Sequence, residues 1–130
     1  MADLRKLAEA ARGKAHAPYS NFHVGVALET NDGLTFSGAN MENASYPEGW
    51  CAETTAIAHM QMAAPGSRIK RVLVLGQGDG VLTPCGGCRQ RLSEFSGADT
   101  QVECTNLKGD TRTFRMDELL PAAFDLDPSH

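Results

Sequence analysis

The sequence of 130 residues lacks the features that mark several large classes of protein. No apolar run approaches the roughly 18 residues of a membrane-spanning helix, and the charged start at 1–9 is unlike the apolar core of a signal peptide. The chain has 12 basic against 16 acidic residues, a net charge of -4, and its basic residues are scattered, which argues against non-specific binding to nucleic acid. We therefore expect a cytoplasmic protein with neither a membrane nor a nucleic-acid partner.

The chain also lacks internal repeats, low-complexity tracts and linker-like segments. Hydrophobic residues make up 42% and charged residues 22%, which is ordinary globular usage and gives no sign of disorder or of a fibrous protein. A chain of this length buries roughly two-thirds of its unfolded surface, enough for one core but not for two. We expect a single domain over 1–130.

Hydrophobic spacing and turn residues predict the order of the elements. The Asp32-Gly33 step between two β-prone runs predicts a hairpin, and the continuous apolar run at 72–75 is typical of a strand buried on both faces. Together the patterns indicate an α/β fold, a three-layer α/β/α sandwich around a mixed five-stranded sheet. The predicted helices cover about 4–12, 51–63, 85–95 and 117–120, and the predicted strands about 24–30, 34–37, 72–75, 100–105 and 111–115.

Four cysteines in a reducing compartment do not indicate a disulfide framework. Cys51, Cys85 and Cys88 lie at predicted helix starts, where free backbone N–H groups and the helix dipole favour a thiolate, whereas Cys104 lies in a predicted strand. The first three thiolates suit one Zn²⁺, since three protein ligands leave the fourth position open for water, as catalytic zinc sites do.

A carboxylate follows the first of these cysteines by two residues, and this spacing makes the pattern specific. Cys51-Ala52-Glu53 and Pro84-Cys85-Gly86-Gly87-Cys88 give the C-x-E and P-C-x-x-C parts of the zinc deaminase signature. Glu53 on the first turn of a helix is placed to reach a water on the metal without binding the metal. Two other interpretations stay open: a structural zinc site with Cys104 as fourth ligand, and a thiol redox pair.

Five sequence blocks, in the same order, make the chain similar to the small homotetrameric cytidine deaminases. The likeness runs from about 17 to 124, over most of the chain. Its blocks are Ala17-Pro18-Tyr19-Ser20-Asn21-Phe22, Asn40-Met41-Glu42-Asn43-Ala44-Ser45-Tyr46, Cys51-Ala52-Glu53, Pro84-Cys85-Gly86-Gly87-Cys88-Arg89-Gln90, and Leu119-Leu120-Pro121 with Phe124.

The resemblance implies a role for each matching position. Cys51, Cys85 and Cys88 would bind one zinc per chain, and Glu53 would shuttle protons. The resemblance also implies a homotetramer in which neighbouring subunits complete each site. The implied substrate contacts are Phe22 against the pyrimidine, Asn40 and Glu42 to the ribose hydroxyls, the Ala52 N–H to pyrimidine O2, the Thr83 carbonyl to the exocyclic amine, and Ala44, Tyr46 and Phe124 from neighbouring subunits.

The chain departs from the family pattern beside the metal ligands. Three thiolates on Zn²⁺ leave a net charge of about -1, so nearby cations are needed to offset it. Family members of this type usually carry arginine directly after the catalytic Glu and after the last Cys; here Arg89 is present but the first position is Thr54. Another arginine such as Arg91 could supply the missing charge, and bulky Trp50 is expected to shape the edge of the pocket.

The resemblance implies hydrolytic deamination of cytidine and 2'-deoxycytidine to the corresponding uridines, with release of ammonia, in pyrimidine salvage. The nearest alternative is a deaminase of a modified cytosine nucleoside such as blasticidin S. A polynucleotide cytosine deaminase would need a cationic path for phosphates, which the acidic composition does not offer. A non-catalytic structural zinc module is the alternative of a different class.

Overall fold

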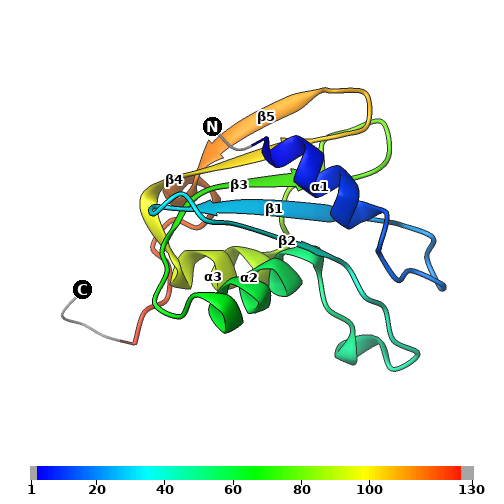
Figure 1. Ribbon diagram of the computed structural model, residues 1–130, viewed down its shortest axis with the longest axis horizontal. Helices are drawn as coiled ribbons and strands as arrows, with labels where there is room; N and C mark the ends of the chain where they lie inside the picture. The colour runs from blue at the N-terminus through cyan, green and yellow to red at the C-terminus, as the bar shows by residue number, and fades with distance from the viewer. Residues whose placement is uncertain (1–2, 127–130) are drawn as a thin grey trace.

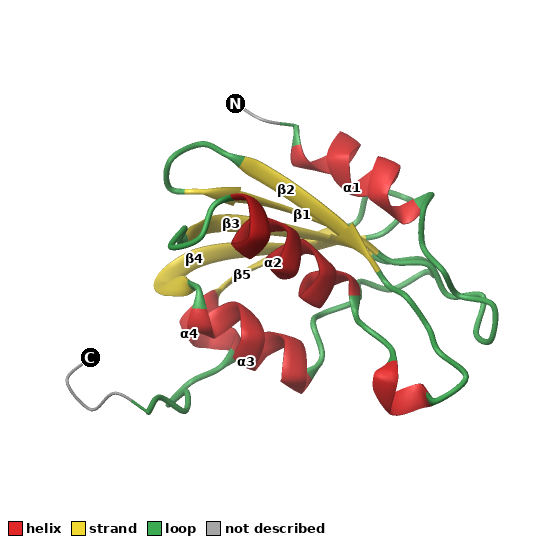
Figure 2. Cartoon of the chain, turned by 60° about the horizontal axis from the view of Figure 1, so that its bottom comes forward, coloured by secondary structure: helices red, strands yellow, loops and turns green. Residues whose placement is uncertain are grey.

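The computed structural model describes residues 3–126, which form one mixed sheet with helices on both faces (Figure 1). The strand order is β2-β1-β3-β4-β5, and of the neighbouring pairs in this sheet β3 and β4 are parallel while the others are antiparallel. Helix α1 covers one face, while α2 and α3 lie side by side on the other (Figure 2). This arrangement confirms the predicted three-layer sandwich with a mixed five-stranded sheet. The strands are Gly25–Thr30 (β1), Thr35–Ala39 (β2), Ile69–Leu75 (β3), Ser96–Thr105 (β4) and Thr111–Arg115 (β5); the helices are Leu4–Arg12 (α1), Ala52–Ala63 (α2), Gly86–Glu94 (α3) and Met116–Leu119 (α4).

The predicted hairpin is formed by β1 and β2, which pair antiparallel. Gly33 in its turn has φ +84°, a left-handed conformation that glycine adopts without strain. Gly38 on β2 has a different function: a Cβ there would collide with the backbone of Ala56 in α2. The missing side chain therefore lets α2 lie directly against β2, the outermost strand on this side of the sheet.

The topology places the N-termini of α2 and α3 at one edge of the sheet, the edge where the carboxyl ends of β2 and β3 lie. Strand β2 is antiparallel to β1, which is antiparallel to β3, so β2 and β3 run in the same direction. Each of these two strands leads through a loop into a helix, β2 into α2 and β3 into α3. Crevices beyond the carboxyl ends of such strands are the usual binding places of α/β folds.

Alternation along the strands divides the core into two layers. Val26, Leu28 and Val74 face α2 and α3, whereas Ala27 and Leu73 face α1. The larger layer lies on the α2 and α3 side, so the two helices that carry the candidate site rest on the better-filled part of the core. Within residues 3–126, no helix has the length and apolarity needed to cross a membrane.

Two strands begin earlier than the sequence predicted, and one short helix was not predicted. Strand β3 starts at Ile69 and β4 at Ser96, because the Thr100 hydroxyl accepts from the Gly97 N–H and donates to the Ile69 carbonyl. These two bonds of the Thr100 side chain hold residues of low strand propensity in the sheet. A 3₁₀ helix, Tyr46–Glu48, occupies the loop between β2 and α2.

Candidate metal and active site

The three cysteines set apart by the sequence converge. Cys51 and Cys85 are the N-cap residues of α2 and α3, and Cys88 lies in the first turn of α3. Their Sγ atoms all lie within 4.8 Å of one another, and none of the three is in a disulfide. Thirty-four residues separate Cys51 from Cys85 along the chain, so the shared sheet edge brings the sulfurs together.

The geometry and chemistry of this cluster fit Zn²⁺. With Zn–S bonds of about 2.3 Å, two sulfurs on one tetrahedral zinc lie roughly 3.8 Å apart, which is compatible with three sulfurs that all lie within 4.8 Å of one another. Cys51 and Cys85 are exposed and Cys88 is buried, so the cluster opens outward on one side. The two helix N-termini favour the negative charge that thiolate ligands carry.

The thiols of Cys51 and Cys88 differ in pKa. A hydrogen bond with Cys88 lowers the pKa of Cys51 to about 6, with a smaller contribution from Cys85. The same bond to Cys51, together with burial, raises the pKa of Cys88. A cluster that already holds one thiolate near neutral pH is suited to attract a divalent cation.

Glu53 lies on the first turn of α2 and is only 5% exposed. Burial, with a smaller contribution from the charge of nearby Cys51, raises the pKa of its carboxyl to about 7, although hydrogen bonds with its own backbone and with Cys88 act to lower it. The sequence predicted a carboxylate beside the metal ligands, and in the structure the Glu53 carboxyl forms a hydrogen bond with Cys88. A carboxyl group of this pKa can both accept and donate a proton near neutral pH.

The fourth cysteine does not join the cluster. Cys104 is fully buried in β4, within the main core, and among the described residues the group that could hold a metal contains Cys51, Cys85 and Cys88 alone. Burial raises the pKa of Cys104 to about 11, as expected for a thiol that packs like a small apolar side chain.

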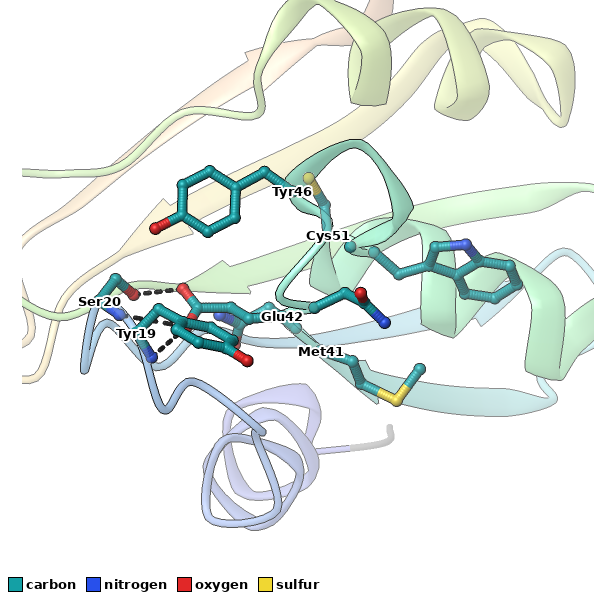
Figure 3. A pocket seen from close by; sticks show the side chains of 10 residues that line it. Tyr19, Ser20, Met41, Glu42, Tyr46 and Cys51 are labelled. Carbon is teal, nitrogen blue, oxygen red and sulfur yellow. Dashed lines mark hydrogen bonds between the residues drawn. The ribbon is translucent and has the colours of Figure 1, made fainter.

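A cavity of about 380 Å³ adjoins the cluster, with Cys51 in its wall (Figure 3). This volume is in the range of small-molecule sites. The ring of Tyr46 meets that of Tyr19 edge to face, with 6.1 Å between centroids. Trp50 lines the edge of the cavity, as the sequence indicated, whereas the contributions of Tyr19, Ser20 and Met41 had not been predicted. Its lining residues are Tyr19, Ser20, Asn40, Met41, Glu42, Asn43, Tyr46, Gly49, Trp50 and Cys51.

Asn40 and Glu42, both expected near the ribose, also hold the walls of this cavity. The Asn40 amide accepts from the Val24 N–H and donates to the Phe22 carbonyl, at 2.9 and 2.8 Å. The Glu42 carboxylate accepts from the Ser20 hydroxyl and from the backbone N–H groups of residues 19 and 20, as Figure 3 shows for Ser20. The Ser20 hydroxyl bond, followed by the two backbone bonds, holds the pKa of Glu42 below its usual range.

The other expected contacts are not among the residues that line this cavity. Ala52 begins α2, so its N–H has no partner within the helix. Phe22 is half-buried against the main core, and Ala44 is exposed in the loop before the 3₁₀ helix. Thr83 directly precedes Pro84 in the loop before α3. Phe124 is 68% exposed and lies in a separate hollow near the end of the chain, where its carbonyl accepts from Gln90.

The arginines near the cluster have separate partners. The Arg89 guanidinium donates to the carbonyls of Pro84 and Leu119 and to the Thr83 hydroxyl. Arg91 instead reaches the sulfur of Cys88, with 3.9 Å between Nη1 and Sγ. The Thr54 hydroxyl is buried and has no hydrogen-bond partner within residues 3–126. Sequence alone ranked Arg89 above Arg91 because Arg89 directly follows a ligand.

Known proteins share this combination of sequence and fold. Residues 2–104 match the family model described as the cytidine and deoxycytidylate deaminase zinc-binding region. A cytidine deaminase of Sporosarcina psychrophila is 40% identical over 126 residues, which cover 94% of this chain and 91% of that protein. One from Halalkalibacterium halodurans is 43% identical over 122 residues, which cover 93% of this chain and 91% of that protein.

A solved structure shows the same likeness in three dimensions. The crystal structure of cytidine deaminase from Burkholderia pseudomallei superposes with a TM-score of 0.88 at 46% sequence identity, covering 95% of this chain and 100% of that one. The match to the zinc-binding family, the converging thiols and the buried carboxylate agree with one another. The chain belongs to the zinc-binding cytidine deaminase family of enzymes.

Proposed function

We propose that the chain hydrolyses cytidine and 2'-deoxycytidine to uridine and 2'-deoxyuridine, with release of ammonia, in pyrimidine salvage. The observation that carries the proposal is the buried Glu53 carboxyl beside three converging thiols, at the wall of a cavity of about 380 Å³. The relatives named above are cytidine deaminases, which supports a cytosine nucleoside as substrate.

The chemistry divides between the metal and Glu53. Cys51, Cys85 and Cys88 would hold Zn²⁺, which would supply the Lewis acidity that makes water a better nucleophile near neutral pH. Glu53 accepts a proton from the water that attacks C4 and delivers it to N3 of the pyrimidine. It then carries the second proton, from the hydroxyl now on C4, to the departing amine, so one carboxyl acts first as base and then as acid. Its pKa of about 7 suits both steps.

Backbone groups at the two helix starts would select an aminopyrimidine. The Ala52 N–H, left free at the start of α2, donates to pyrimidine O2. The Thr83 carbonyl accepts from the exocyclic amine, and the half-buried Phe22 ring packs against the base. A backbone carbonyl accepts from an amine but not from the keto oxygen of the product, so this contact favours substrate over product.

The loop side of the cavity would hold the sugar. At the cavity wall Asn40 already accepts one hydrogen bond and donates another, Glu42 accepts, and each keeps capacity for the ribose hydroxyls. The same pair disfavours the alternative of a strongly modified nucleoside such as blasticidin S. Comparing turnover of cytidine with that of blasticidin S decides between the two.

We also propose that four copies of the chain form a homotetramer with shared sites. In a single copy Tyr46 is 75% exposed and Phe124 is 68% exposed, large apolar surfaces that a neighbouring subunit would cover. Mixing an inactive Glu53→Gln variant with a Phe124→Ala variant tests the sharing. Recovery of activity above that of either variant alone supports shared sites, and no recovery contradicts them.

An ultraviolet assay of cytidine conversion by wild type and Glu53→Gln, with zinc measured in both, tests the proposed reaction. We expect Glu53→Gln to keep its zinc and to lose about 10²- to 10⁴-fold in kcat, because general acid–base catalysis contributes that much. Equal turnover would remove Glu53 from the mechanism. Zinc-loaded wild type that converts no nucleoside would favour a structural zinc module.

A further inference from the structure

The proposed zinc site carries more negative charge than the zinc ion alone can balance. Three thiolates and one Zn²⁺ sum to -1, and an ionised Glu53 beside them adds another negative charge. Buried or half-buried negative charge needs a nearby cation or hydrogen-bond donors. Helix α3, which carries Cys88, also carries two arginines, Arg89 and Arg91.

Arg89 directs its donors elsewhere. Its Nε donates to the Pro84 carbonyl at 2.8 Å and its Nη1 to the Leu119 carbonyl at 3.0 Å. The remaining arm donates to the Thr83 hydroxyl. These bonds tie the loop that carries Cys85 to the end of α4, so Arg89 fixes a ligand loop rather than contacting a sulfur.

Arg91 is the arginine that faces the cluster. It lies three residues after Cys88, on the same face of α3, and its Nη1 is 3.9 Å from the Cys88 sulfur. The guanidinium lies over Gly87, where an added Cβ would come within 3.2 Å of Nη1. Glycine at this position thus leaves the space through which Arg91 reaches back to the sulfur.

The two arginines of α3 thus have different partners. Arg89 bonds to oxygens of the loop before α3 and of α4, whereas Arg91 approaches a sulfur of the cluster. Thr54, which directly follows Glu53, contributes only a neutral hydroxyl.

We propose that Arg91 is a positioning residue of the metal site, which donates a hydrogen bond to the Cys88 thiolate and offsets the excess negative charge of the three-sulfur centre. This inference rests on Cys51, Cys85 and Cys88 being the zinc ligands. A hydrogen bond to a ligand sulfur withdraws electron density from it and so tunes the metal. Arg91 thereby supplies from α3 the charge that Thr54 does not supply from α2.

The test replaces zinc with Co²⁺ and records the sulfur-to-cobalt charge-transfer band of wild type and Arg91→Gln. Loss of the hydrogen bond makes the sulfur easier to oxidise, so we expect the band to move to longer wavelength. We also expect Arg91→Gln to release zinc to a chelator about tenfold faster, the usual scale for partners of metal ligands. Arg91→Lys, which keeps the charge, should lie between the two.

Two further variants separate the contact from folding and from total charge. Gly87→Ala keeps Arg91 and favours the helix, but its methyl displaces the guanidinium, so a smaller shift in the same direction is expected. Arg112→Gln removes an exposed arginine stacked on Phe114 and should leave the band and the release rate as in wild type. Far-ultraviolet circular dichroism checks the fold of each variant.

A wild-type band and release rate in Arg91→Gln would overturn the proposal, as would an equal shift in Arg112→Gln. Absence of any sulfur-to-cobalt band in wild type would refute the zinc ligands themselves, and the role of Arg91 with them. Failure of nucleoside turnover with a normal band in wild type and the expected shift in Arg91→Gln would contradict the proposed reaction but leave the Arg91 assignment in place.

Discussion

The sulfur cluster and the neighbouring cavity are held by the fold in different ways. The cluster stands on the first turns of two helices packed on the sheet, and both Cys88 and Glu53 are buried. The cavity is lined by loops, where Tyr46 and Trp50 are 75% and 45% exposed. The three thiols and Glu53 are thus held by helices packed on the core, whereas the cavity wall consists mainly of loop residues, several of them exposed.

Removal of the metal should have the largest effect on deamination, because it acts on the sulfur cluster itself. We expect Cys85→Ala to lose zinc and all detectable deamination, since a site with two remaining thiols holds the metal poorly. The matched control is Cys104→Ala, which alters a buried thiol outside the cluster and should keep one zinc per chain. Metal analysis and the nucleoside assay on both variants check this. Equal loss of zinc in both variants would indicate a site in which four sulfurs surround the metal. That result would contradict the division between the sulfur cluster and the cavity.

The buried carboxyl should also affect stability, with a sign that depends on pH. Burial raises the pKa of Glu53 from 4.5 to about 7, so the folded chain binds this proton more tightly than the unfolded chain does. The resulting stabilisation is fully present below about pH 4.5 and is lost as pH rises through about 7. Above that pH the metal-free chain holds an ionised carboxylate in the core, at a cost of up to about 3 kcal/mol.

Glu53→Gln removes this cost, so the metal-free variant should be more stable than wild type at pH 8 and gain less at pH 5. Urea unfolding of both metal-free proteins at the two pH values measures the difference. Glu48→Gln makes the same change at an exposed carboxylate and serves as control. A variant no more stable than wild type at pH 8 would show that the fold does not hold Glu53 under strain.

A substitution in the loops that line the cavity should have the smallest of these effects. Glu42→Gln weakens the bonds from Ser20 and from the backbone of residues 19 and 20, and it removes the charge offered to the sugar. KM for cytidine should rise about tenfold with kcat within about twofold, since one charge-assisted hydrogen bond is worth that much. Steady-state kinetics against Glu48→Gln decide. A fall in kcat at unchanged KM would place Glu42 with the reacting groups instead.

The sequence predicted the sulfur cluster better than it predicted the cavity. Helix starts at Cys51 and Cys85 follow from local signals, and the Asp32-Gly33 turn sets the hairpin direction that brings both starts to one edge. Spacing along α3 favours Arg91, three residues after Cys88, but the sequence does not show that Arg89 is held by the Leu119 carbonyl, because that partner comes from a distant part of the chain. Likewise, no local pattern shows that the Asn40 amide bridges residues 22 and 24.

X-ray absorption at the zinc edge of the purified protein tests the central claim most directly, because it counts the atoms around the metal. The account predicts three sulfurs at about 2.3 Å and one lighter atom at about 2.0 Å. It also predicts that the lighter atom persists in Glu53→Gln, since the carboxylate is not a ligand. Four sulfurs around the zinc, or loss of the lighter atom in Glu53→Gln, would contradict it.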